Sequence, residues 1–311
     1  MTDTLIAPAI EPLPVEPPAT PKQRRSLPKP TLVLAVIWLV GLTFVSVFAD
    51  FLPFVRGYAQ RVRGATRFAF GPGNDFWFGS DQLGRDVFAR CVYGARISLL
   101  VATASILTGI IIGGTLGLIA GYRRGAIDRV ISIFTDSLLA LPALIIAILF
   151  VGRFDALRLN NPDTFGWLSR TWSIVFVLSL LSIAPLARIV RAQTLSLSQR
   201  EFVLAARSLG AKNTRVILRE ILPNLVPAMV SVAFTGIAIL LVAEGGLAFL
   251  GYSVQAPTPT WGYLINEGRP RIEQAWWATL MPCFMMFITV LAFNLIGDRV
   301  ARHFDIREAT L

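Results

Sequence analysis

Six long apolar runs, separated by polar segments, set the pattern of hydrophobic and polar positions along this chain. Each run has about the 20 residues that an α-helix needs to cross the hydrocarbon core of a bilayer. The runs cover residues 31–52, 97–120, 130–151, 172–189, 226–250 and 276–296. The pattern therefore predicts an all-α, polytopic membrane protein with six transmembrane helices and both termini on one side. The first run lacks a small-residue cleavage site, so we expect it to remain as a span.

The polar segments divide the chain into four parts. Residues 1–30 contain eight prolines and little apolar periodicity, which predicts a disordered tail. Residues 31–95 are expected to form the first span and an external loop. Residues 96–298 are expected to form a five-helix core that includes a polar loop at 200–225, and residues 299–311 a C-terminal tail.

Composition agrees with a membrane protein. Hydrophobic residues make up 54% of the chain and charged residues only 15%, against about 25% charged residues in an average soluble domain. The formal net charge of +10 must therefore be interpreted through the topology, and no nucleic-acid partner is expected. Two distant cysteines and a single histidine give no cluster for a structural metal site or a disulfide scaffold.

The positive-inside rule favours cytoplasmic N- and C-termini, because arginines then gather in the tails and the inner loops. One segment conflicts with this orientation, since the loop after the first span would be external and yet is rich in arginine. Its arginines are Arg56, Arg61, Arg63, Arg67, Arg85, Arg90 and Arg96.

The polar interval 201–223 reads as two short helices joined at a glycine. Apolar residues recur at helical spacing from Phe202 to Leu209, and Gly210 follows as a natural C-terminal cap residue. A second helical run follows, and Pro223 is expected to limit or kink it. This pattern is typical of a docking surface for a soluble partner, although an amphipathic loop resting on lipid headgroups has the same pattern.

Glycines recur at every fourth position of the second apolar run. This spacing leaves a groove on one helix face, where another helix can approach closely. The groove predicts helix packing within the chain or between subunits, and lipid-facing glycines are the alternative. The glycines are Gly109, Gly113, Gly117 and Gly121.

Two further positions are candidates for a pathway or gate. Glu244 lies deep in the fifth run, where a carboxylate is costly unless it faces a pathway or is hydrogen-bonded to its neighbours. Trp261 follows a proline-rich external segment that suits a rigid gate or docking lip, or an anchor at the membrane interface. Residues 263–267 are expected to form a short re-entrant or surface helix.

Several kinds of chemistry are missing from the sequence. It contains no G-x-x-x-x-G-K-[ST] phosphate-binding loop, no G-x-S-x-G elbow and no H-E-x-x-H. We therefore expect no catalytic residues, no metal site and no cofactor within this chain.

The polar interval resembles the EAA loop of binding-protein-dependent ABC importer permeases. The similarity rests on the paired Ala205 and Ala206, then Gly210, and a segment that ends at Pro223. Leu204 departs from the usual Glu of that pattern. Glu220 departs from the usual Ile.

Further motifs are similar to the C-type permease subunit of dipeptide, oligopeptide and nickel importers. The stretches are FGSDQLGRD at 78–86, YGARISL at 93–99, FLG with PTPTWG at 249–262, and LAFNLIGD at 291–298. The first stretch supplies the signature residues Gly79, Asp81, Gly84, Arg85 and Asp86. The resemblance covers residues 32–307.

The resemblance implies the type I ABC importer permease architecture in a bacterial inner membrane. It implies a cytoplasmic coupling helix at 201–223, with Glu201 and Arg207 as candidate polar contacts to an ATPase subunit, although a solvated helix face explains both equally well. It also implies a second homologous permease, two ATPase subunits that bind ATP and Mg²⁺, and an extracytoplasmic binding protein. The chain itself is then a transport subunit and not an enzyme.

Cargo and mechanism remain open at this stage. The sequence favours di- or oligopeptides and leaves nickel or another small solute as alternatives with the same fold. An ATP-independent secondary carrier is a more distant alternative.

Overall fold

A computed structural model of the chain describes residues 29–61, 70–73 and 75–308. Most of the proline-rich tail predicted at 1–30 lies outside these residues. The described elements are α1 Lys29–Val47, α2 Val87–Arg123, α3 Gly125–Ala140, α4 Ala143–Asn160, α5 Pro162–Phe165, α6 Arg170–Leu197, α7 Glu201–Ser208, α8 Asn213–Arg215, the π-helical turn η1 Val216–Ile221, α9 Leu222–Phe249, α10 Trp261–Gly268, the 3₁₀ turn η2 Arg269–Arg271 and α11 Trp276–Glu308. The described part of the chain is helical and has no named strand, as the sequence predicts.

Five of the six predicted spans are continuous helical stretches. They are long and apolar enough to cross a membrane, and they run over Pro30–Val47, Val87–Arg123, Arg170–Leu197, Asn213–Phe249 and Trp276–His303. Four of them extend beyond the predicted runs. The largest differences are that α2 begins at Val87, before the predicted residue 97, that the helical path into α9 begins at Asn213, before the predicted residue 226, and that α11 continues through the predicted tail to Glu308.

The third span differs from the single run predicted at 130–151. It consists of α3 and α4, which meet at an angle of 88°. The break falls at Leu141, whose backbone is extended (φ −85°, ψ 136°), and at Pro142. A proline has no N–H to donate and disfavours the helical conformation of the preceding residue, so the helix stops there. The third predicted span is therefore a bent pair of helices.

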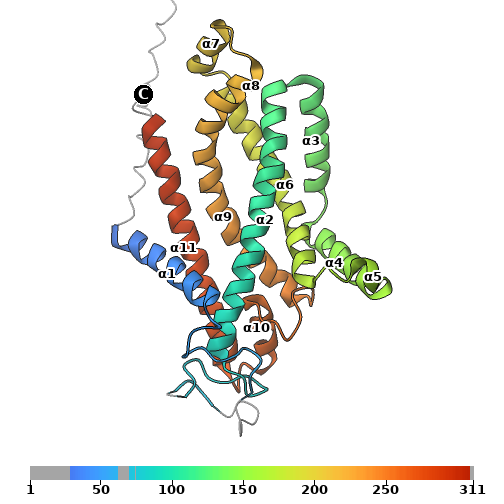
Figure 1. Cartoon of the computed structure of the whole chain (residues 1–311), viewed down its shortest axis with the longest axis vertical. Coiled ribbons are helices and arrows are strands. Elements are labelled where there is room, and N and C mark those ends of the chain that lie inside the picture. Colours follow the sequence, from blue (N-terminus) through green and yellow to red (C-terminus); the bar gives the residue numbers. More distant parts are fainter. Residues whose placement is uncertain (1–28, 62–69, 74, 309–311) are drawn as a thin grey trace, which may run out of the picture.

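The helices form an elongated bundle with two distinct ends (Figure 1). The first, which we call the α7 end, carries α7, α8 and the junction of α2 with α3. The opposite end, which we call the α10 end, carries α10 and the loops between α1 and α2. Helix α1 lies obliquely against α11, where the indole N–H of Trp38 donates to Thr289 Oγ1 at 3.0 Å. The main core lies between α2, α6, α9 and α11.

The predicted glycine groove of α2 lies against α6. A β-carbon added to any of these glycines would come closer to α6 than van der Waals contact allows. The distances would be 2.1 Å from Gly109 to Ser182 Oγ, 2.5 Å from Gly113 to the Ile183 carbonyl oxygen, 2.4 Å from Gly117 to the Ala187 carbonyl oxygen and 2.7 Å from Gly121 to the Arg191 carbonyl oxygen. The two helices thus touch backbone to backbone from Gly113 to Gly121, about two turns, and at Gly109 the contact is with the Ser182 side chain.

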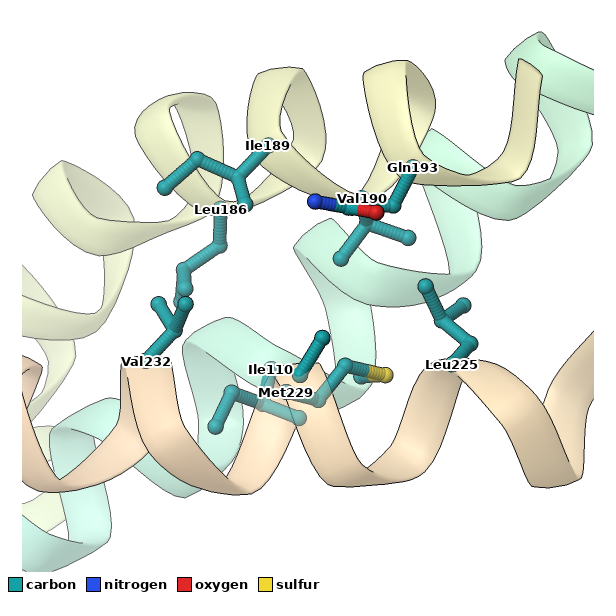
Figure 2. A pocket seen from close by; sticks show the side chains of 9 residues that line it. Ile110, Leu186, Ile189, Val190, Gln193, Leu225, Met229 and Val232 are labelled. Atoms are coloured by element: carbon teal, nitrogen blue, oxygen red, sulfur yellow. The ribbon is translucent and has the colours of Figure 1, made fainter. Parts of the chain in front are cut away.

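Helices α6 and α9 diverge on the other side of α2. Figure 2 shows the resulting apolar gap, lined by Ile110 of α2 and by side chains of α6 and α9. Gln193 of α6 is the polar side chain in this lining. The gap holds about 10 Å³, roughly one water molecule.

The glycine contact predicts a steep cost for a larger side chain. Gly117→Leu should lower stability by about 1–3 kcal/mol or more, because the backbone of α6 cannot yield as a flexible side chain could. The measurement is the thermal midpoint of the detergent-solubilised protein, followed by size-exclusion chromatography. Gly41→Leu in α1 is the matched control, since nothing lies within 4 Å of a β-carbon there. Equal midpoints for the two variants would contradict a tight α2–α6 contact.

Candidate functional site

Helix α7 ends in a sharp reversal built on Gly210. The N–H of Gly210 donates to the Arg207 carbonyl at 2.9 Å, and the N–H of Ala211 donates to the Ala206 carbonyl at 3.0 Å. These two bonds define a Schellman motif, which requires a left-handed residue at Gly210, here with φ 78°. The chain therefore turns back within three residues, and α7 projects as a short, separate helix.

One face of α7 packs on the body of the protein. Val203 is fully buried in a small apolar cluster at the α7 end, and Ala206 and Ala211 pack against the same cluster. Its other buried members are Val190, Leu197, Val216, Ile221 and Leu225. Of the two alanines in the EAA-like pattern, only Ala205 is exposed, while Ala206 belongs to the contact of α7 with its own chain.

The outer face of α7 is apolar as well as charged. Leu204 and Leu209 are 51% and 88% exposed, and Glu201 and Arg207 are also exposed. The Arg207 guanidinium lies 5.1 Å from the centroid of the Tyr122 ring. A hollow of about 330 Å³ opens beside these residues, lined also by the end of α2.

The second helix of the interval does not end at Pro223. A continuous helical path runs from Asn213 to Phe249. The π-helical turn η1 ends at Ile221, just before Pro223, which has no N–H to donate to the preceding turn. The expectation that Pro223 would limit the helix is therefore wrong, whereas the alternative of a kink stays a prediction.

The signature loop at 79–86 forms the base of the α10 end. Gly79 and Gly84 adopt positive φ values of 75° and 72°. A β-carbon on Gly79 would come within 2.5 Å of the Trp277 ring, so glycine is required there on two grounds. Asp86 is the N-cap of α2 and accepts the Phe88 N–H at 2.8 Å. Burial raises the pKa of the Asp86 carboxyl, while its backbone hydrogen bonds and the nearby Arg56 oppose the increase.

Four charged side chains form a buried ion network between this loop and α10. The network consists of Asp81, Arg85, Arg90 and Glu267, so two arginines balance two carboxylates. Arg85 donates to Asp81 Oδ2 at 2.6 Å and to Glu267 Oε1 at 2.9 Å. Arg90, which is 1% exposed, donates to both carboxylates, with 2.8 Å to Glu267 Oε2. The network holds α10 on the first turn of α2.

The arginines of the loop after the first span are thus largely neutralised. Arg85 and Arg90 belong to the ion network, and Arg56 lies 3.7 Å from Asp86 Oδ2. Arg96 donates to Asp50 Oδ2 at 2.9 Å and to the carbonyls at the end of α1. The hydroxyl of Tyr93 and the Arg96 guanidinium lower the pKa of Asp50. Of the other three arginines of this loop, Arg61 forms an isolated backbone bridge with Arg85, and Arg63 and Arg67 lie outside the described residues.

Both candidate gate residues are buried. Trp261 is 0% exposed, and its indole N–H donates to the Cys91 carbonyl at 3.0 Å. Glu244 is 1% exposed and accepts hydrogen bonds from the hydroxyls of Ser253 and Thr260, the latter at 2.8 Å. In this conformation the two residues tie α10 to α2 and to the end of α9.

Sequence reasoning missed the partners of the signature residues. Glu267, the partner of Arg85, lies 182 positions away in the sequence. Another contact that was missed involves Arg170, which donates to the Ser253 and Gly251 carbonyls at 3.0 and 3.1 Å and also pairs with Asp155. The available signal was the excess of arginine in the loop after the first span, since buried arginines require carboxylates elsewhere.

A bundle that crosses the membrane repeatedly, with a projecting helix at one end and a closed cap at the other, defines a multi-pass membrane protein of the permease class. The sequence matches the profile of the family described as binding-protein-dependent transport system inner membrane component over residues 113–309. The chain belongs to this family, so the resemblance identified from its motifs is confirmed.

Several curated relatives are similar over most of their length. The dipeptide transport system permease protein DppC of Alkalihalophilus pseudofirmus is 35% identical over 265 residues, covering 85% of this chain and 83% of that protein. DppC of Bacillus subtilis is 36% identical, covering 88% and 81%. The glutathione transport system permease protein GsiD of Pectobacterium atrosepticum is 36% identical, covering 88% and 86%.

Solved structures share the fold at lower identity. An inward-facing MetNI methionine ABC transporter matches with a TM-score of 0.58 and 18% identity, covering 69% of this chain and 96% of that chain. An amino acid ABC transporter matches with a TM-score of 0.52 and 16% identity, covering 70% and 94%. The predicted ABC importer permease architecture is confirmed by this likeness.

Removing one member of the ion network should destabilise the α10 end. Glu267→Gln leaves Arg85 and Arg90 short of a carboxylate, and loss of one partner of a buried ion pair typically costs about 3–5 kcal/mol. The measurement is protease resistance of the 79–86 loop together with the thermal midpoint. Glu273→Gln is the matched control, because Glu273 is an exposed carboxylate only six residues after Glu267. Identical behaviour of the two variants would show that the network does not hold α10.

Proposed function

We propose that this chain is the transmembrane permease subunit of an ATP-driven importer for di- or oligopeptides, which an extracytoplasmic binding protein delivers. Family membership supports the importer class, and the similarity to dipeptide, oligopeptide and glutathione permeases supports the cargo. The structural observation that carries the proposal is α7, a projecting helix with an exposed apolar face on a rigid Schellman turn.

The proposed assembly pairs this chain with a second, homologous permease and two ATPase subunits. ATP and Mg²⁺ would bind to the ATPases, because this sequence has no phosphate-binding loop of its own. The α7 end would face the cytoplasm and the α10 end the binding protein. The ion pairs of the arginine-rich loop support this orientation. The positive-inside rule disfavours free arginines in an external loop, and arginines paired with carboxylates weaken that objection.

The proposed coupling mechanism is mechanical. ATPase closure would move α7, and the movement would reach α9 directly because the helix from Asn213 to Phe249 is continuous. Tyr122 of α2 contacts both α7 and α8. Its ring lies under the Arg207 guanidinium of α7, and its hydroxyl donates to Asn213 Oδ1 of α8 at 2.8 Å. The far end of α9 carries Glu244, whose hydrogen bonds lead into the α10 end. A small displacement at α7 would therefore be felt at the external mouth.

The two alanines of the EAA-like pattern should behave differently. Ala205→Glu places a charge on the exposed face, so it should abolish ATPase co-purification and lower peptide uptake at least tenfold without loss of stability. Ala206→Glu buries the same charge against the apolar cluster, so it should lower the thermal midpoint of the isolated chain. The measurements are co-purification, uptake and thermal midpoint on both variants. Normal co-purification and uptake of the Ala205→Glu complex would overturn a docking role for this face.

Transport by the reconstituted complex tests the cargo. We expect ATP-dependent accumulation of a labelled dipeptide in proteoliposomes that contain both permeases, the ATPases and the binding protein. Nickel is the direct comparison, because nickel importers share this fold class. Uptake of nickel but not of peptide would reject the proposed cargo, and uptake by this chain alone without ATP would indicate a secondary carrier.

A further inference from the structure

Helices α3 and α6 carry four charged side chains on facing surfaces inside their membrane-spanning segments. Arg191 forms a two-point contact with Asp128, with 2.7 Å from Nη2 to Oδ2. Arg188 forms one hydrogen bond of 2.9 Å, from Nη2 to Asp136 Oδ1. The Arg191–Asp128 pair is thus satisfied by its own geometry, whereas the Arg188–Asp136 pair has donor and acceptor capacity left over.

The second pair lies well inside the spans. Arg188 precedes the end of α6 at Leu197 by nine residues, about 14 Å of helix, and Asp136 follows the start of α3 at Gly125 by eleven residues, about 17 Å. Arg188 is flanked by Ala187 and Ile189, and Asp136 by Thr135 and Ser137. Nevertheless the side chains of Arg188 and Asp136 are 65% and 55% exposed on this chain.

An exposed ion pair at this depth is incompatible with a lipid-facing surface. Each charge would cost about 2.5–3.5 kcal/mol on insertion scales, and such residues in membrane proteins face a protein interior or a water-filled cavity. The lipid-facing surface of α3 is elsewhere: Val130 and Phe134 are exposed and apolar, and the helical period of 3.6 residues places them on other sides of the helix from Asp136.

The backbone gives a second, independent observation. The break between α3 and α4 leaves extended peptide groups at Leu141 and Pro142, five residues beyond Asp136, and Leu141 is 56% exposed. Irregular backbone at membrane depth persists only where it is covered by protein or lines an aqueous cavity. In α6, Pro185 has no N–H, so the Leu181 carbonyl on the Arg188 face lacks its usual helical donor.

A polar cavity already exists at this position. It measures about 80 Å³, enough for several water molecules, and Ser132, Thr135, Asp136, Arg188 and Arg191 contribute its polar lining. The surface that contains it is not covered by any other described part of the chain.

We propose that this α3–α6 face lines the translocation pathway and that Arg188 and Asp136 bind the carboxylate and the ammonium group of the passing peptide. The proposal rests on the proposed function. A guanidinium matches a carboxylate in shape and charge, and a carboxylate matches an ammonium group. On binding, the Arg188–Asp136 ion pair would be replaced by two ion pairs of the same kind, one from each residue to the peptide. Because the pair within the protein is lost, the peptide would be recognised but bound weakly enough to be released.

The first test is thiol labelling in nanodiscs. The two native cysteines, Cys91 and Cys283, are replaced, and a cysteine is placed by Ala192→Cys, an exposed position one turn from Arg188 that leaves both charges intact. We expect a charged, membrane-impermeant maleimide to label this site in the assembled complex, and we expect peptide to slow the labelling several-fold. Val130→Cys on the apolar face is the matched control and should stay unlabelled. Equal labelling of both positions, or of neither, would overturn the pathway assignment.

The second test separates substrate contact from a structural ion pair. Uptake of a free dipeptide and of its C-terminally amidated form is compared in wild type and Arg188→Gln, with binding protein saturated in each case. We expect the ratio of free to amidated uptake to fall about tenfold in the variant, because only the free peptide has a carboxylate to lose. Asp136→Asn should change the ratio of free to N-acetylated peptide in the same way.

The possible outcomes distinguish this inference from the proposed function. If both variants lower the uptake of all peptides equally, the pair is structural and the peptide contact is rejected. Unchanged ratios with unchanged uptake reject it as well. If wild-type complex transports no peptide at all, the proposed function fails instead, and the labelling result still decides whether this face is aqueous.

Discussion

The contact between α2 and α6 is the constraint on which the rest of the bundle depends. Within a bilayer, helices gain nothing from hiding apolar side chains from lipid, so they associate through close packing. Four glycines spaced one turn apart face α6 with no space for a β-carbon, and three of them bring the α2 backbone onto the α6 backbone. This fixes the two helices as one unit, and the remaining helices are arranged around it. Helix α9 lies against α2 but diverges from α6, which leaves the narrow apolar gap of Figure 2.

Because α2 is longer than a bilayer is thick, the same helix participates in both ends of the molecule. Its first turn is capped by Asp86 and clamped by the ion network through Arg90. Its last turn carries Tyr122, which contacts Arg207 of α7 and Asn213 of α8. Helix α9 also runs from the α7 end toward the α10 end, where it carries Glu244. Two long helices therefore link the ends, and a movement at one end cannot leave the other unchanged unless the helices bend.

The sequence predicted the parts of the fold that arise from local pattern. Length and apolarity identified the spans, four-residue spacing identified the glycine groove, and Gly210 identified the reversal after α7. Pro142 was visible within the third run, but its apolar neighbours concealed the bend because hydropathy does not report direction. The orientation of Ala206 toward its own chain depends on η1 and α9, which no periodicity within 201–209 reveals.

Long-range pairing was the part that could not be predicted. Nothing near Asp81 or Arg85 points to Glu267, since the pairing exists only once α10 folds back onto α2. Local pattern is informative where one segment decides its own geometry, and it fails where two distant segments must meet. The excess of arginine in the loop after the first span was nevertheless a true signal, because it indicated that carboxylates from elsewhere had to balance it.

The charges of this chain fall into two physical classes. Those of the α10 end are buried, balanced and hydrogen-bonded on several sides: Arg90 contacts two carboxylates, and Asp81 contacts two arginines and the backbone of its own loop. Such a network fixes a structure, because moving any member exposes the others to an apolar surrounding without a partner. The Arg188–Asp136 pair is the opposite case, since it is exposed within a span and shares one hydrogen bond. The exposed groups of this pair are open to a ligand or to solvent, as the proposed pathway requires.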